Sequence, residues 1–208
     1  MNNELKTLIG KEEKILWEGK PNKKCYIFES IVNPLLPFAL IWLLVDSLFF
    51  GATLLIGDGE GMLVTIPFLL IHMAPVWIYL SGVLLTNRRY KNTAYIITDK
   101  AIYVSGGTFA QNFNMKPFAE LSHIDLHRGI FDQKFNVGDI IATTNQIGIN
   151  GTRGIPSDAI ICINSISDYT EVYSLVKKLQ TDIYTDVMYP NAKRPAENPG
   201  YNTEYKGL

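Results

Sequence analysis

Two long apolar runs, residues 34–56 and 62–86, constrain this chain more than any other feature. Each run is longer than the roughly 20 residues that a helix needs to cross a hydrocarbon core of about 30 Å. The first run contains one charged residue, Asp46, and the second contains none, only His72. The short acidic link at residues 57–61 leaves the two helices room only to pack antiparallel. The pattern predicts a two-helix transmembrane hairpin over residues 34–86, because two such runs in succession are untypical of helices buried in a soluble domain.

The composition of the whole chain hides this division. The 208 residues carry a net charge of −1 and are 47% hydrophobic, values that a soluble protein could also have. The first 24 residues have no apolar core followed by a small-residue cleavage site, so we expect the first span to act as an uncleaved insertion signal. Cys25 and Cys162 stand far apart and outside any metal-ligand spacing. Their placement indicates no disulfide framework and fits a reducing compartment.

The charges beside the apolar runs predict the orientation of the chain. Only Asp58 and Glu60 are charged in the link, whereas basic residues flank both outer ends. The positive-inside bias therefore predicts a multi-pass protein of the cell membrane with both termini in the cytoplasm. The membrane-flanking basic residues are Lys20, Lys23, Lys24, Arg88, Arg89 and Lys91.

Asp46 and His72 form a candidate intramembrane polar pair. Each lies eleven residues from the link, so both are expected about 16 Å from it and at the same depth. Equal depth allows a hydrogen bond across the hairpin, and ionisable residues inside a membrane are usually paired or functional. One interpretation is a proton or ion relay, or a polar contact to a partner's helix. The other is a structural pair that fixes helix register, which we favour because a relay normally needs more than one pair. Pro67 and Pro75 are positions where the second run could kink.

Residues 1–33 are expected to form a cytoplasmic N-terminal segment. Apolar side chains such as Leu5 and Trp17 are interspersed with charges in this segment. The segment could be an amphipathic helix on the bilayer surface, or it could pack on the soluble domain. Its mixed charge favours packing on the domain.

After Lys91 the periodicity changes from helical to alternating, which is typical of strands. Asp99-Lys100 has the length of a hairpin turn, and Asn150-Gly151 is a strong turn signal. Ser167 offers an N-cap for a helix whose apolar residues recur at helical spacing as far as Ile183. Strands in succession followed by one amphipathic helix predict an antiparallel sheet or open barrel that the helix plugs. The expected strands are residues 93–98, 101–105, a segment near 111–115, 121–127, 139–144 and 158–164 in a domain of residues 92–185, and residues 187–208 are expected to be a flexible tail.

The order of these pieces resembles the bacterial PH-like (pleckstrin-homology) membrane proteins, a family once described only as a domain of unknown function. The matching features are ILWEGKP at residues 15–21, YIITDKAI at 95–102, Gly106-Gly107, VGDI at 137–140 and the helix approach at 163–176. The resemblance covers about residues 12–180. It implies an α+β membrane protein in which about seven strands form a PH-like barrel or sandwich, capped by a C-terminal helix and tethered to the cytoplasmic face of a bacterial membrane. It does not imply an activity.

The charge of the predicted domain argues against two classes of ligand. PH domains that bind phosphoinositides use a basic first hairpin loop, but this loop is only Thr98-Asp99-Lys100. Residues 92–183 contain seven Lys or Arg and nine Asp or Glu, a net charge of −2. Binding of phosphoinositide or nucleic acid is therefore not expected. A protein partner, or another copy of the chain, fits better, at a sheet edge or in a groove beside the C-terminal helix.

His123, Asp125 and His127 form the most enzyme-like cluster, because alternate residues of a strand share a face. The outer histidines would lie about 13 Å apart, too far to share one ion without a bulge. The sequence instead favours a solvated face, with Ile124 and Leu126 pointing into the core. It contains no nucleophile elbow, phosphate-binding loop or paired-cysteine motif, so we expect no catalysis, no metal and no cofactor.

The sequence therefore predicts a non-enzymatic PH-like module that is integral to the lipid bilayer and serves protein interaction or scaffolding. The alternative is a small accessory subunit of a membrane transport or stress-response complex. In that alternative, Asp46 and His72 are the working residues.

Overall fold

The computed structural model describes residues 3–56, 59–144 and 160–188. It is an α+β structure that divides into two compact units, one of residues 1–26 with residues 89–208, and one of Ile27–Arg88. Several sequence predictions lie outside the described residues. These are the Asn150-Gly151 turn, the start of the last predicted strand at residues 158–159, and most of the predicted tail.

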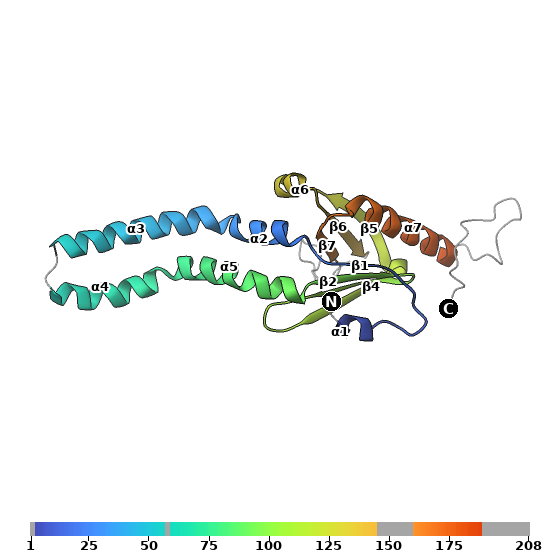
Figure 1. Cartoon of the computed structure of the whole chain (residues 1–208), viewed down its shortest axis with the longest axis horizontal. Helices are drawn as coiled ribbons and strands as arrows, with labels where there is room; N and C mark the ends of the chain where they lie inside the picture. The colour runs from blue at the N-terminus through green and yellow to red at the C-terminus, as the bar shows by residue number, and fades with distance from the viewer. Residues whose placement is uncertain (1–2, 57–58, 145–159, 189–208) are drawn as a thin grey trace, which may run out of the picture. The chain divides into compact units, whose positions relative to one another are not determined.

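The Ile27–Arg88 unit contains α3 (Leu35–Ile56), α4 (Gly59–His72) and most of α5 (Ala74–Asn92). α3 has 22 residues and is by itself long and apolar enough to cross a membrane. Only 11% of its most apolar stretch is buried by the rest of the chain. α4 lies beside α3 and runs in the opposite direction (Figure 1). A further helix, α2 (Lys23–Ile31), precedes α3 and ends in this unit.

The second apolar run is broken, whereas the sequence predicted one span over residues 62–86. α4 and α5 meet at an angle of 50° across Met73. Pro75, the second residue of α5, is tolerated at a helix start but cannot donate the backbone hydrogen bond that would continue α4. Pro67 lies inside α4 without ending it. Among the described residues, α3 alone has the length and composition of a membrane span, and α4 with α5 has them only when counted as one bent span.

One sheet of the other unit has four antiparallel strands in the order β1-β2-β3-β4. Asp99-Lys100 joins β2 to β3 as the sequence predicted, and β4 ends two residues after the predicted third strand. β4 is an edge strand, paired only with β3 among the described residues. The strands are β1 (Ile15–Gly19), β2 (Ala94–Thr98), β3 (Ala101–Gly106) and β4 (Asn112–Pro117).

The strand β1 is a feature that sequence reasoning missed. Residues 15–19 were expected in an N-terminal segment that packs on the 92–185 domain, and no strand was expected there, but they pair antiparallel with β2, with Trp17 opposite Ile97. A bulge between Ile15 and Trp17 shifts the register. Residues 1–26 therefore belong to the same compact unit as the sheets.

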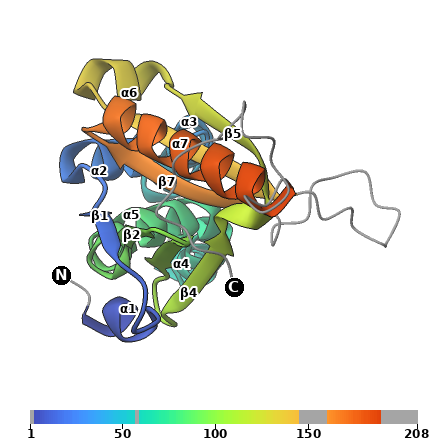
Figure 2. The same cartoon turned by 90° about the vertical axis from the view of Figure 1, so that its right-hand side faces the viewer.

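The second sheet has three antiparallel strands in the order β5-β6-β7, and α7 lies across it in contact with η1, β5 and β6 (Figure 2). The two sheets share no strand, so the seven strands of the described residues form two sheets rather than the single closed barrel that was one expectation. The short helix α6 was not predicted. The elements are η1 (Phe118–Glu120), β5 (Leu121–His127), α6 (Ile130–Phe135), β6 (Gly138–Thr144), β7 (Ile160–Ile166) and α7 (Tyr169–Met188).

The core of this unit is apolar and combines side chains of both sheets with the inner face of α7. The helix contributes Val172, Val176 and Ile183, which the helical spacing of the sequence had placed on one face. A smaller cluster lies on the other face of the four-stranded sheet, where Leu5 of α1 (Asn3–Thr7) is fully buried. The main core includes Tyr95, Ile97, Ile102, Phe118, Leu121, Ile140, Ala142, Ile161, Ile163 and Ile166.

Candidate functional site

Asp46 and His72 are in contact. Asp46 projects from the middle of α3 and His72 is the last residue of α4, and Nδ1 of His72 lies 2.7 Å from Oδ1 of Asp46. The aspartate side chain is 4% exposed, whereas the histidine side chain is 36% exposed. The helical spacing predicted this hydrogen bond, and the contact joins α3 to the end of α4 just before the bend.

Aromatic side chains hold the histidine in place. The ring of His72 stacks on Trp42 of α3 and on Phe68 of α4, with ring centroids 5.0 Å and 5.1 Å apart. The indole N–H of Trp42 also donates to the backbone carbonyl of His72 at 2.7 Å. The carbonyl at the end of α4 has no partner within its own helix turn, so this bond satisfies it. The imidazole is thus fixed by two stacking contacts and one carboxylate contact.

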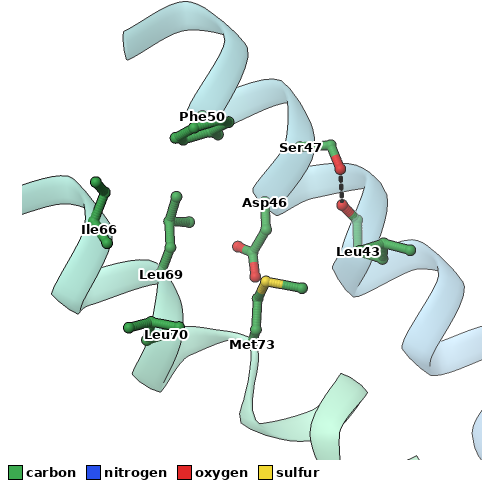
Figure 3. Close-up of a pocket in the computed structure, with 8 residues that line it drawn as sticks. All are labelled: Leu43, Asp46, Ser47, Phe50, Ile66, Leu69, Leu70 and Met73. Carbon is green, nitrogen blue, oxygen red and sulfur yellow. Dashed lines mark hydrogen bonds between the residues drawn. The ribbon is translucent and has the colours of Figure 1, made fainter. Parts of the chain in front are cut away.

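The second carboxylate oxygen of Asp46 has no such partner. Oδ2 is buried and accepts no hydrogen bond from any described residue. The carboxyl group lines a cavity of about 410 Å³ between α3 and α4 (Figure 3). Ser47 also lines this cavity, but its hydroxyl donates to the backbone carbonyl of Leu43 at 2.6 Å. The remaining lining is apolar: Leu43, Phe50, Ile66, Leu69, Leu70 and Met73.

The edge strand β4 is a second candidate surface. Phe113 and Met115 share one face of β4 and are 37% and 48% exposed. Their partners on β3, Ser105 and Tyr103, are buried. Leu5 of α1 covers the β2 and β3 part of this face, so the apolar strip on β4 stays exposed beside it.

Among the six basic residues predicted to flank the membrane, Lys20, Lys23 and Arg89 each contact a different partner. Lys20 Nζ donates to the carbonyl of Lys91 at 3.4 Å, and Lys23 Nζ lies 5.8 Å from the centre of a tyrosine ring. Arg89 Nε donates to Thr108 Oγ1 at 3.2 Å. The exposed members of the set are Lys23, Lys24, Arg88, Arg89 and Lys91.

The side chains of His123, Asp125 and His127 are exposed on β5, on the solvated face that the alternation favoured. Ile124 packs against the core as expected. Leu126 does not, because it is 38% exposed near the end of the strand, so its predicted core position is wrong.

Burial raises the pKa of four described groups of the sheet unit, Tyr95, Tyr103, Asp139 and Cys162, and Asp139 and Tyr103 also show the effect of a hydrogen bond. Burial raises the pKa of the Asp139 carboxyl, although the backbone N–H of Ser165 donates to it at 2.6 Å and opposes the shift. Burial, together with the hydrogen bond to Glu13, raises the pKa of the Tyr103 hydroxyl to about 12. Asp139 and Tyr103 both take part in structural hydrogen bonds, and neither lines the cavity beside Asp46.

The family model for the bacterial PH domain matches residues 39–180. The chain belongs to the bacterial PH domain family. The match begins within α3 and ends within α7, so it covers most of the apolar helices and every described strand except β1. Searches of curated proteins and of solved structures returned no match to this bacterial PH domain protein.

Sequence reasoning found the two ionisable partners of the site but not its surroundings. Trp42 precedes Asp46 by one helical turn, and Phe68 precedes His72 by one turn, a spacing that could have identified both aromatic contacts. The strip of Phe113 and Met115 follows from their alternation in β4. The cavity depends on how apolar side chains of similar type pack, and no sequence pattern specifies that.

Proposed function

We propose that this chain is a non-enzymatic, membrane-anchored PH-like module that binds a protein partner at the cytoplasmic face of a bacterial cell membrane. Membership of the bacterial PH domain family suggests a protein-interaction module. The observation that carries the anchoring is the exposure of apolar side chains along α3, where Leu55 is 89% exposed and Leu48 is 67% exposed. Burying one such side chain away from water is worth about 1.5–3 kcal/mol, and a lipid environment supplies that burial.

The α4–α5 pair supports a second, bent span in this proposal. Leu63, Val64 and Ile71 of α4 are each more than 70% exposed, so this helix too presents apolar side chains that no described residue covers. The basic residues that precede α3 and end α5 support a cytoplasmic location of both termini. The sheets would then lie within a short linker's reach of the bilayer, which raises their effective concentration for membrane-associated partners.

The partner in this proposal is an extended peptide segment that adds a strand to β4. The edge of β4 is unpaired among the described residues, so its backbone can accept another strand. Apolar side chains at alternate positions of the peptide would contact Phe113 and Met115. The net negative charge of residues 92–183 makes a phosphoinositide headgroup or a nucleic acid a poorer occupant.

Photocrosslinking in native membranes tests the interaction. A photoreactive amino acid replaces Phe113 in the full-length chain, and a matched control places it at Lys178, an exposed position on α7. The proposal predicts discrete protein adducts from position 113 that are absent from position 178. Adducts with lipid alone, or equal adducts from both positions, would overturn binding at β4.

The alternative function, an accessory subunit of a transport or stress-response complex, is favoured by one observation. Asp46 uses only Oδ1 for His72 and keeps Oδ2 without a partner among the described residues, so a polar group of another subunit could bind there. The double variant Asp46→Asn with His72→Gln discriminates between the functions. Loss of a co-purifying complex while the sheets stay folded supports the alternative, whereas an unchanged set of β4 adducts supports the interaction module.

A further inference from the structure

The cavity between α3 and α4 has the size and lining of a small-molecule site. Its volume of about 410 Å³ lies within the range of roughly 300–1,000 Å³ that is typical of ligand pockets. Such pockets combine an apolar lining with a few convergent polar groups that fix the ligand's orientation. Here the polar group is the carboxyl of Asp46, which Figure 3 shows projecting from α3 toward Leu69 and Met73.

The orphan oxygen of Asp46 indicates what kind of atom the cavity would accept. A buried acceptor without a partner carries an energetic penalty, and native structures rarely leave one unexplained. Water is a poor solution, because an ordered water needs two to four polar partners. The only other polar side chain of the lining, Ser47, already donates its hydroxyl to a backbone carbonyl. An apolar molecule that carries one hydrogen-bond donor would donate to Oδ2 of Asp46 and pack against the apolar lining.

We propose that this cavity binds an apolar molecule with a single hydrogen-bond donor head, a hydroxyl or an ammonium group, which donates to Oδ2 of Asp46. The apolar body of the ligand packs against Leu69, Leu70 and the other apolar side chains of α3 and α4. His72 stays on Oδ1, held by Trp42 and Phe68, so ligand binding leaves the pair intact. This site goes beyond the proposed function, since it lies on the apolar helices and does not depend on a partner at β4.

Met73 is the side chain that would admit the ligand. Oδ2 is itself buried, so a lining group must turn aside before a donor can reach it. Met73 lines the cavity at the bend between α4 and α5, and its unbranched chain has three rotatable bonds. Rotation about these bonds can change the rotamer of Met73.

Three photoreactive probes test the proposal on the full-length chain in lipid nanodiscs. They are a long-chain alkyl diazirine that carries a hydroxyl, the same diazirine with a primary ammonium group, and the methyl ether as a control that has no donor. The proposal predicts saturable labelling of peptides from α3 and α4 by at least one donor probe, at about tenfold lower concentration than by the ether. Whichever donor probe saturates first identifies the head group as neutral or cationic.

Four variants locate the labelling. Asp46→Leu removes the acceptor and should bring the donor probes to the level of the ether, whereas Ser47→Ala, a lining change that keeps Oδ2, should retain the tenfold difference. Leu70→Trp fills the cavity and should abolish saturable labelling, whereas Leu63→Trp, at an exposed position of α4 outside the cavity, should not. If Asp46→Leu fails to fold, the difference between the donor probes and the ether on the wild-type chain still tests the proposal. Equal labelling by all three probes, or labelling that does not saturate, would overturn the proposal.

Discussion

The indole N–H of Trp17 donates to Oδ2 of Asp168 at 2.6 Å, a contact between residues 151 positions apart in the chain. Trp17 lies in β1 and Asp168 immediately precedes the first residue of α7. A carboxylate at this position also interacts favourably with the positive end of the helix dipole. The contact therefore ties the N-terminal strand to the start of the C-terminal helix.

Trp17→Phe should destabilise the sheet unit. The variant keeps an aromatic ring against the core but leaves the carboxylate of Asp168 without its indole donor, and a hydrogen bond to a charged group contributes about 1.5–3 kcal/mol. Thermal unfolding of the full-length chain measures the loss. Leu16→Ala, at a more exposed position of the same strand, is the matched control and should cost less. Equal effects of the two substitutions would contradict a specific role for the Trp17 bond.

The coupling of Asp46 and His72 can be measured with a double-mutant cycle. Each single substitution, Asp46→Leu or His72→Leu, removes one partner of the 2.7 Å hydrogen bond, and His72→Leu leaves the whole carboxyl group of Asp46 buried without a partner. We expect the double variant to be more stable than the sum of the single effects by about 0.5–3 kcal/mol. Thermal unfolding in detergent measures the stability of the two single variants and the double variant relative to the wild-type chain. Strictly additive effects would show that the contact contributes nothing to stability.

The stability of the sheet unit should fall as the pH rises from about 10 to about 12. The pKa of Tyr103 is raised to about 12 by burial and by Glu13, whereas an unfolded chain releases this proton near the ordinary value of 10.0. Between these two values the folded state binds more protons than the unfolded state, so stability is lost with increasing pH. Burial also raises the pKa of Tyr95, so Tyr103→Phe should reduce the slope without removing it. A slope in this window that Tyr103→Phe leaves unchanged would contradict the assignment.

Gly138 leaves room for the first residue of α7. A Cβ at position 138 would lie 2.9 Å from Cγ and 3.0 Å from Cβ of Tyr169, and the Cβ of Tyr169 is fixed to the backbone of the helix. Gly138→Ala should therefore cost about 1–3 kcal/mol, as overpacking does elsewhere. Gly106→Ala, where a Cβ meets nothing within 4 Å, is the control that should cost much less. Chemical denaturation of both variants measures the difference, and similar losses would show that the contact with Tyr169 is not what Gly138 serves.

The contact between Asp46 and His72 could be predicted because helical rise converts spacing in the sequence into depth along the helices. The helix α7 and the turn at Asp99-Lys100 could be predicted because their residues repeat at helical spacing or match a two-residue hairpin. In the helix and the turn the local sequence specifies the geometry, and for the pair the equal spacing of both residues from the link does so.

The strand β1 and the cavity beside Asp46 could not be predicted, because they depend on tertiary packing, and the angle between α4 and α5 could not be predicted either. β1 has five residues and lies between charged segments, so its pairing with β2 depends on a partner about 80 residues away. Pro75 indicated a kink, but the sequence did not indicate its 50° angle across Met73. The unpartnered oxygen of Asp46 and the cavity beside it follow from which side chains meet at one depth between α3 and α4. Apolar composition predicts that these helices are buried in lipid or protein, but it does not predict the space left between them.

Labelling of single cysteines in intact bacteria tests the membrane-anchored arrangement most directly. Glu60→Cys places a thiol near the start of α4, and Lys177→Cys places one on the exposed face of α7. An impermeant maleimide is applied before and after permeabilisation, and the unmodified chain gives the background from Cys25, which is buried, and Cys162, which is half-buried. We expect position 60 to react in intact cells and position 177 to react only after permeabilisation. Reaction of both positions only after permeabilisation, in a protein that alkaline washing releases from the membrane fraction, would contradict the membrane-anchored arrangement.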